Sequence, residues 1–176
     1  MNLLNHLNYN EINNENRNSA PQYAAVAICI LPNQNIIYTK RQDTMPTHKG
    51  QIAFPGGKVQ KGDRDIIDTA IRETKEELLL EEVSLIPVGI LNSFDTKEFE
   101  FPVYPVVFEL DSVNLSNFDE TEVKKVYSVD IPYLKDRNNW EYRGWYDSDW
   151  LIRIGEDILW GATARMTLEL LQLKLD

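Results

Sequence analysis

The chain has 176 residues, of which 43% are hydrophobic and 26% charged, a composition typical of a soluble globular protein. Its formal net charge of −10 argues against binding nucleic acid through a basic surface, and no apolar run reaches the length that crosses a membrane. Cys29 is the single cysteine, so an intrachain disulfide is excluded. A reducing compartment fits, and a cytoplasmic location is therefore expected.

Two parts of unequal length are expected along the chain. Residues 1–19 are rich in Asn and are predicted to form a flexible N-terminal arm. Residues 20–176 contain neither an internal repeat nor a linker, which indicates a single domain.

The first half of this domain is predicted to form a hairpin, a glycine turn and a helix. Residues 23–31 are a continuous apolar run, typical of a buried strand, and residues 36–41 form the next strand after a Pro-Asn turn. The sequence Phe-Pro-Gly-Gly at 54–57 is the glycine turn. The helix is predicted to begin at about Asp65, with Asp65 as N-cap and Asp68 opposite it in a capping-box-like pair.

The second half is predicted to contain mostly strands. Strands are expected within 83–94 and 101–110, around a hairpin loop at 95–100. The later segments are a mixed helical turn and strand at 122–131, a break at 132–139, strands at 145–154 and 158–160, and an amphipathic helix at 163–173. This order predicts the α/β class, an α+β mixed sheet with helices packed on its faces.

The helix after the glycine turn carries an unusual set of carboxylates. Glu73, Glu76 and Glu77 stand at i, i+3 and i+4, so their side chains converge on one face near the helix C-terminus. Their mutual repulsion and the helix dipole both disfavour this arrangement, and a hard cation such as Mg²⁺ or Mn²⁺ would remove the conflict. An ordinary solvated acidic face is the alternative. A different stripe of the helix, expected to face the core, consists of Ile67, Ile71, Thr74 and Leu78.

The stretch resembles the Nudix box, G-x5-E-x7-R-E-U-x-E-E-x-G-U, in which U is a bulky aliphatic residue. Gly57 fills the opening glycine, and residues 72–77 fill the R-E-U-x-E-E core. Segments outside the box resemble the coenzyme A pyrophosphatase branch of that family, which also has a box one residue longer. They are residues 36–41, 48–57, 105–107, 122–127 and 159–165.

The sequence departs from these patterns at four positions. Arg64, not Glu, stands eight residues before Arg72, and Thr74 replaces the aliphatic residue of the core. Leu79 replaces the late glycine and would be strained if that position has a positive φ. Pro46 stands where the upstream signature of the branch usually has Arg.

The resemblance implies an α/β/α sandwich and a divalent-metal-dependent hydrolase that cleaves phosphoric anhydrides. It implies metal ligation by Glu76, Glu77 and the carbonyl of Gly57, with Glu73 a third ligand or a partner of the attacking water. It implies that Arg72 orients the glutamates through charge-assisted hydrogen bonds. The alternative is a surface i,i+4 pair with Glu76, which predicts only a small effect on stability.

Further site residues are expected from loops around the box. Glu122 is the first choice for an additional catalytic acid, ahead of Glu120 and then Glu98 or Glu100. The substrate phosphates are expected to meet the glycine turn at Gly56 and three basic side chains, Arg41, Lys49 and Lys58, for which plain solubilising charge is an equal alternative.

Coenzyme A or a derivative is the expected substrate, with phosphopantetheine and adenosine 3',5'-bisphosphate as products. The same chemistry on ADP-ribose or dinucleotide polyphosphates is one alternative, and a binding module without turnover is another. The expected partner is the nucleotide substrate, with a homodimer considered and neither nucleic acid nor membrane expected.

Overall fold

The computed structural model describes Leu7 and residues 22–81, 83–95 and 101–175. The predicted arm at 1–19, apart from Leu7, and most of the predicted loop at 95–100 lie outside these residues.

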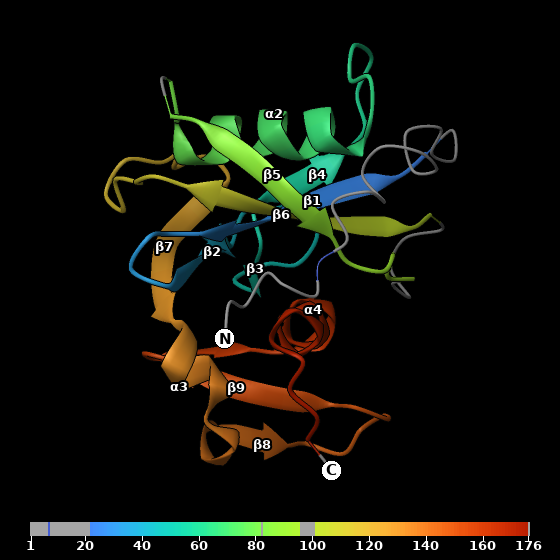
Figure 1. The fold of residues 1–176 in the computed structure, drawn as a ribbon, viewed down its shortest axis with the longest axis vertical. Coiled ribbons are helices and arrows are strands. Elements are labelled where there is room, and N and C mark those ends of the chain that lie inside the picture. Colours follow the sequence, from blue (N-terminus) through green and yellow to red (C-terminus); the bar gives the residue numbers. More distant parts are fainter. Residues whose placement is uncertain (1–6, 8–21, 82, 96–100, 176) are drawn as a thin grey trace.

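Seven strands form the main sheet, in the order β3-β2-β1-β6-β5, with β4 also paired to β1 and β7 to β2 (Figure 1). They are β1 (Ala24–Ile30), β2 (Asn35–Arg41), β3 (Ile52–Ala53), β4 (Gly56–Lys58), β5 (Leu85–Ile90), β6 (Val103–Leu110) and β7 (Val123–Asp130). β1 runs parallel to β6 and antiparallel to β2 and β4, so the sheet is mixed, as the sequence predicts.

A smaller antiparallel sheet lies below the main one, in the order β10-β9-β8 (Figure 1). Its strands are β8 (Trp140–Tyr142), β9 (Trp150–Ile154) and β10 (Asp157–Leu159). The chain reaches it from β7 through the short helix α3 (Ile131–Lys135) and a 3₁₀ turn, η2 (Arg137–Asn139).

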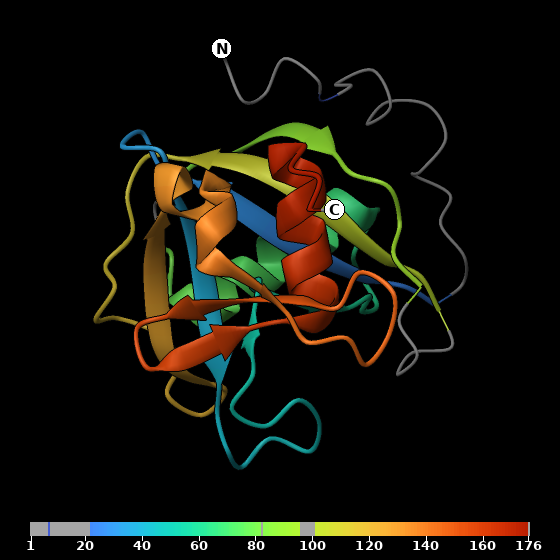
Figure 2. The same cartoon turned by 90° about the horizontal axis from the view of Figure 1, so that it is seen from below.

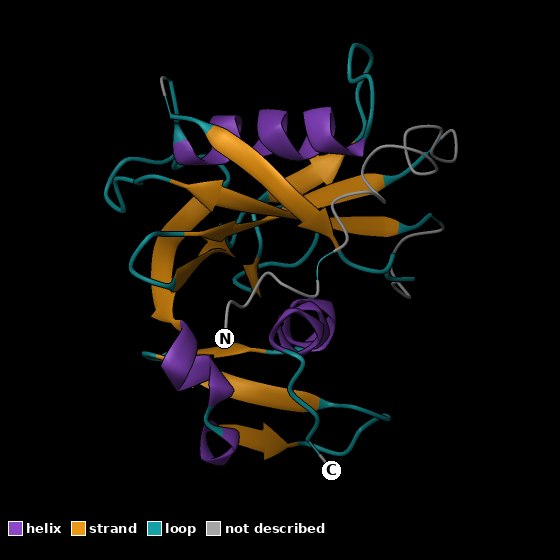
Figure 3. Ribbon diagram, in the orientation of Figure 1, coloured by secondary structure: helices purple, strands orange, loops and turns teal. Residues whose placement is uncertain are grey.

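Two longer helices cover opposite faces of the main sheet, which gives the expected α/β/α sandwich (Figure 3). They are α2 (Ile66–Leu78) and α4 (Gly161–Leu171). Successive side chains of a strand point to opposite faces, and β1 shows this directly: Ala27 and Cys29 pack in the cluster under α2, whereas Ile28 packs in the cluster with α4.

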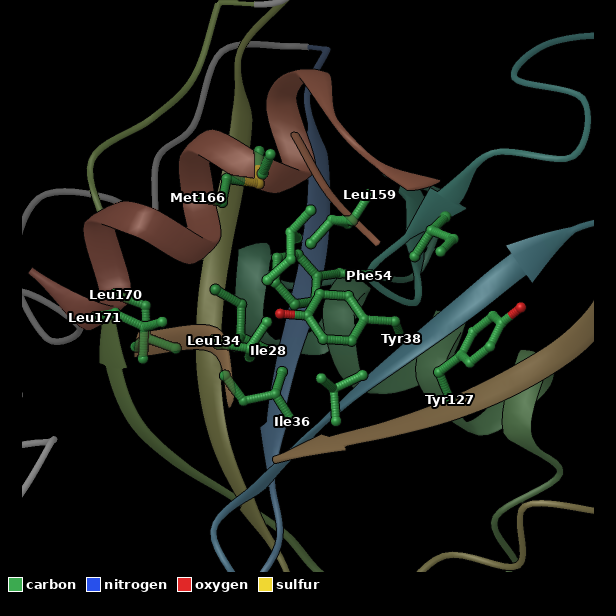
Figure 4. Packing of buried hydrophobic residues seen from close by; sticks show 14 of the residues in the cluster. Ile28, Ile36, Tyr38, Phe54, Tyr127, Leu134, Leu159, Met166, Leu170 and Leu171 are labelled. Carbon is green, nitrogen blue, oxygen red and sulfur yellow. The ribbon is translucent and has the colours of Figure 1, made fainter. Parts of the chain in front are cut away.

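The core on the α4 side joins the two sheets. It contains side chains from the main sheet, from α3 and from the C-terminal segment, and Figure 4 shows several of them packed together. Tyr38 and Phe54 stack with ring centroids 4.8 Å apart. The Tyr38 hydroxyl bonds to the Thr167 hydroxyl on α4 at 3.0 Å, so each of these two buried hydroxyls has a partner.

Several expectations for the second half of the chain were wrong. Residues 123–130 are strand throughout, so the turn of the expected mixed segment at 122–131 is limited to its ends, Glu122 and Ile131. The expected break at 132–139 contains most of α3, because proline is tolerated in the first turn of a helix. The strand expected at 145–154 begins only at Trp150, and the strand at 140–142 was not predicted.

The buried stripe of α2 also differs from the prediction. Leu78 and Thr74 are buried as expected, but Ile66 and Ala70 complete the stripe, while Ile67 and Ile71 are only half-buried. The whole helix is therefore rotated slightly relative to the expected orientation, and this rotation carries Glu77 toward the sheet.

Candidate metal and diphosphate site

The local sequence around α2 fixes where the helix begins. The carboxylate of Asp65 accepts hydrogen bonds from the backbone N–H groups of Ile67 and Asp68, at 3.0 and 2.9 Å. These bonds satisfy two of the unpaired donors of the first turn. Asp65 is thus the predicted N-cap, but the Asp68 carboxylate accepts from the backbone of Arg64, one residue before the position that a capping box requires.

Glu77 is buried between α2 and the main sheet, with 5% of its surface exposed. Its Oε1 accepts from the backbone N–H of Gly56 at 3.1 Å, and its Oε2 accepts from the Thr39 hydroxyl at 3.2 Å. Burial raises the pKa of Glu77 to about 7, and the Gly56 N–H and the charge of Arg41 offset only part of that shift. Neither hydrogen-bond partner of this carboxylate carries a positive charge.

The glycine turn is shaped by its contacts with α2 and β1. A Cβ on Gly57 would lie 2.5 Å from the carboxylate of Glu73, and a Cβ on Gly56 would lie 2.4 Å from the carbonyl oxygen of Ala25. Only glycine allows both close approaches. The backbone of the turn therefore lies directly against the acidic face of the helix.

Arg72 is the hub of a hydrogen-bond network that uses all five of its N–H donors. Nη1 donates to Glu73 at 2.8 Å and to Glu76 at 3.1 Å, and Nη2 donates to the carbonyl oxygen of Lys58 at 3.0 Å. Nε and Nη2 each donate to Asp63 at 2.9 Å. A surface pair with Glu76 is present but is one bond among five, so Arg72 is fixed mainly by its other partners.

Asp63 is a site residue that the sequence prediction missed. Its side chain is 6% exposed, and besides Arg72 it accepts from the Thr69 hydroxyl and the Gln60 backbone, both at 2.9 Å. The Arg72 guanidinium is the main reason that the pKa of Asp63 is lowered. Counting forward from Gly57 places Asp63 at the acidic position of G-x5-E, whereas counting back from Arg72 pointed to Arg64. The extra residue of the longer box therefore lies between Asp63 and Arg72.

Glu122 lies close enough to Glu73 for its charge to affect the pKa of Glu73. Burial is the main cause of the raised pKa of Glu73; Arg72 opposes it, and the charges of Glu76 and Glu122 add to it. Glu122 is exposed, in a turn held to α2 by the bond from the Asp119 N–H to the Glu77 carbonyl oxygen at 2.9 Å. The turn thus brings Glu122 close to the acidic helix; its role as a catalytic acid stays a prediction.

The alternative acids are placed less favourably or lie outside the described residues. Glu120 is exposed, and its backbone carbonyl accepts from the Gln42 side chain. Glu98 and Glu100 fall outside the residues that the structure describes.

The residues expected to contact the substrate phosphates have different surroundings. Arg41 is near enough to Glu77 to lower its pKa, and the Arg41 Nε is buried with no hydrogen-bond partner among the described residues. Lys58 lies in β4, with Nζ 5.4 Å from the centre of the Phe101 ring. Lys49 is exposed in the loop after β2, and the Gly56 N–H is already engaged by Glu77.

The glutamate carboxylates of α2 and the carbonyl of Gly57 are chemically suited to bind a hard divalent cation. Carboxylates and a backbone carbonyl are the ligands that Mg²⁺ and Mn²⁺ prefer, and Glu77 is a buried anion that a cation would stabilise. In the described part of the chain, however, no three acidic, His or Cys side chains are gathered closely enough to hold a metal as they stand. Glu76 has 58% of its side chain exposed and pairs with Arg72, so a bound cation would have to draw its carboxylate toward Glu73 and Glu77 to complete the cluster.

Comparison with known proteins agrees with this geometry. Residues 21–148 match the family model described as the NUDIX domain. With its glycine turn, carboxylate-bearing helix and mixed sheet, the chain belongs to the Nudix hydrolases.

Individual relatives make the match more specific. The mouse protein named mitochondrial coenzyme A diphosphatase NUDT8 is 32% identical over 85% of this chain and 76% of its own length. The protein named Nudix hydrolase NudL from Pectobacterium atrosepticum is 31% identical over 80% of this chain and 77% of its own length. Nudix hydrolase 15 of Arabidopsis thaliana is 34% identical over 82% of this chain, which spans only 55% of that relative. The chain therefore has relatives of the coenzyme A pyrophosphatase type.

A solved structure supports the fold alone. The crystal structure of DR0079 from Deinococcus radiodurans aligns with a TM-score of 0.54 at 19% identity, over 82% of this chain and 80% of that one.

None of the helices in the described part of the chain combines the length and the apolar character that crossing a membrane requires.

Proposed function

We propose that this protein hydrolyses the diphosphate bond of coenzyme A or a derivative, with Mg²⁺ or Mn²⁺ held by Glu73, Glu76, Glu77 and the carbonyl of Gly57. The observation that carries the proposal is Glu77: a carboxylate buried between helix and sheet, beside a glycine turn, with a pKa raised to about 7. Such a group has little structural use and fits a cation ligand.

The reaction requires three contributions from the site. A bound divalent cation would supply charge for the diphosphate and a more acidic water. Arg72 holds Glu73 and Glu76 in place through charge-assisted bonds. Glu73 or the neighbouring Glu122 accepts the proton of the attacking water.

The bond changes are those of an anhydride hydrolysis. The water oxygen bonds to one phosphorus, the bridging P–O bond breaks, and the second phosphate leaves as a monoester. With coenzyme A the products are phosphopantetheine and adenosine 3',5'-bisphosphate. Arg41, whose Nε is buried without a partner among the described residues, is the basic group best placed to meet a phosphate oxygen.

Coenzyme A is favoured as the substrate by two observations on the sequence. The segments at 36–41 and 48–57 resemble the signature of that branch, and a relative of 32% identity is named a coenzyme A diphosphatase. The exposed Pro46, which replaces the usual Arg of that signature, leaves ADP-ribose and dinucleotide polyphosphates as alternatives. We also propose a cytoplasmic location, which the single buried Cys29 supports.

A substrate panel tests the proposal. The protein is incubated with coenzyme A, ADP-ribose or diadenosine polyphosphates, with Mg²⁺ or Mn²⁺, and the products are identified by mass spectrometry. We expect phosphopantetheine and adenosine 3',5'-bisphosphate from coenzyme A, at the highest kcat/KM of the panel. If another compound of the panel is cleaved with a higher kcat/KM, that compound replaces coenzyme A as the proposed substrate. If none of the compounds is cleaved, a binding module without turnover is favoured.

A further inference from the structure

Thr39 is a buried residue of β2 whose hydroxyl faces the acidic helix. It is 1% exposed, and its Oγ1 lies 3.2 Å from Oε2 of Glu77. The only other acceptor within reach among the described residues is the Ala53 carbonyl oxygen, at 3.5 Å, the limit for a hydrogen bond. The strand itself does not need this hydroxyl, because valine has nearly the same shape and a high strand propensity.

The position of the hydroxyl is fixed on both sides. In the sheet, Thr39 pairs with Ala53 of β3 and with Val126 of β7, so its backbone cannot shift independently. A side chain held by two neighbouring strands offers a rigid donor to a flexible glutamate.

The contact with Thr39 leaves Glu77 able to bind a cation. An ionised carboxylate has about four acceptor positions on its two oxygens. Glu77 uses one on each oxygen, for Gly56 and for Thr39, which leaves the remaining positions open. The two donors thus orient the carboxylate without blocking it.

We propose that Thr39 is a positioning residue that orients Glu77 for the divalent cation. This inference rests on the proposed function, because it assumes that Glu77 is a metal ligand. Partners that hydrogen-bond a metal ligand typically change metal affinity 10–100-fold when they are removed. A purely structural Thr39 would instead affect stability and leave metal affinity unchanged.

The test is Mn²⁺ affinity, measured by calorimetry or by electron paramagnetic resonance on the substrate-free protein. We expect Thr39→Val to weaken Mn²⁺ binding about 10–100-fold, and Thr39→Ser, which keeps the hydroxyl, to restore most of it. Thr74→Val is the matched control: Thr74 is also fully buried, but its hydroxyl donates to the Ala70 carbonyl oxygen at 2.6 Å. We expect wild-type affinity for this variant.

A double variant shows whether Thr39 acts through Glu77. In a Glu77→Gln background, the further change Thr39→Val is expected to have no additional effect on Mn²⁺ affinity. Thermal unfolding checks that each variant is folded. Should Thr39→Val fail to fold, Thr39→Ser and Thr39→Ala form the comparison, and at least a tenfold difference in affinity between them is expected.

Two results would overturn the inference, and they are distinguishable. Equal affinity of Thr39→Val and wild type, together with a large loss in Glu77→Gln, would make Thr39 structural and leave the proposed function standing. Unchanged affinity in Glu77→Gln itself would remove Glu77 as a ligand and overturn both proposals.

Discussion

At the scale of single residues, Glu77 has the least favourable environment of the acidic face. It is buried, and neither of its two hydrogen-bond partners carries a charge. Burying an ionised group without a paired charge is unfavourable. Without a cation, this residue should therefore reduce the stability of the fold once it is ionised.

The pH dependence of stability follows from the raised pKa of Glu77. The pKa of Glu77 is raised from 4.5 to about 7 in the folded protein, so between these values the folded chain holds a proton that the unfolded chain has released. The contribution of Glu77 to the free energy of unfolding therefore falls as pH rises from about 4.5 to 7, by up to about 3 kcal/mol. Urea unfolding in the presence of EDTA, at several pH values, measures this change in the free energy of unfolding.

Glu77→Gln is the control for this measurement. Other carboxylates, such as Asp63, have lowered pKa values, and their stabilising contributions are lost at lower pH. The difference between wild type and Glu77→Gln isolates the single group. Parallel pH profiles for the two proteins would show that Glu77 has an ordinary pKa.

Asp63 holds Arg72, and we expect its removal to act on catalysis through that arginine. Asp63→Asn retains the size of the side chain but loses the charge that pairs with the guanidinium, so Arg72 is less firmly directed at Glu73. The expected effect on kcat is about 10–100-fold.

The matched control for Asp63 is Asp68→Asn. Asp68 also pairs with an arginine, but its partner Arg64 has 83% of its side chain exposed, and exposed pairs contribute little. We expect kcat to be unchanged in this variant. Equal kcat losses in the two variants would argue against a specific role for Asp63.

At the scale of elements, α2 ends in a strained residue. Leu79, the C-cap, has φ 47° and ψ 48°, in the left-handed region that favours glycine, and its side chain is 44% exposed. We expect Leu79→Gly to raise the free energy of unfolding by about 1 kcal/mol, because glycine adopts this conformation freely. Chemical denaturation measures the change.

Leu79→Ala separates the backbone effect from the loss of the side chain. Alanine keeps a Cβ in the left-handed conformation, so no gain is expected. A gain equal to that of glycine would mean that the leucine side chain, and not the backbone conformation, is unfavourable.

Elements with a long local pattern were predictable from the sequence, and elements that depend on distant partners were not. The apolar run of β1 and the capped helix α2 were confirmed close to their predicted bounds. β8 has only three residues, and its pairing with β9 defines it as a strand. β4 likewise exists because the glycine turn pairs with β1.

The same distinction applies to the candidate site. The box spacing predicted that Glu73, Glu76 and Glu77 converge on one face. The structure places Glu73 and Glu76 on Arg72 but buries Glu77 against Thr39 and Gly56 instead. The contacts of Glu77 with Thr39 and Gly56 cross 38 and 21 residues of sequence, so no local pattern reveals them. The roles of these residues in catalysis and metal binding remain predictions.

At the scale of the whole molecule, the small C-terminal sheet is expected to unfold together with the main sheet. The core on the α4 side includes Tyr38 and Ile28 of the main sheet and Ile152 and Leu159 of the small one. Lys40 on β2 also binds Asp157 on β10 at 2.6 Å. Removing one sheet would expose the core of the other.

The tryptophans allow this to be tested directly. All four lie between residues 140 and 160, so fluorescence reports the small sheet and its surroundings, whereas far-UV circular dichroism reports the whole chain. We expect the two urea transitions to coincide, as in two-state unfolding. A fluorescence transition at lower urea would show that the C-terminal unit unfolds independently.

The central claim is that the buried carboxylate of α2 holds a divalent cation that is required for diphosphate hydrolysis. The most direct test is the initial rate of coenzyme A cleavage by wild type and by Glu77→Gln, each with saturating Mn²⁺ and with EDTA. We predict turnover only for wild type with Mn²⁺, while circular dichroism shows both proteins folded. Turnover by Glu77→Gln at the wild-type rate, or by wild type in EDTA, would contradict the claim.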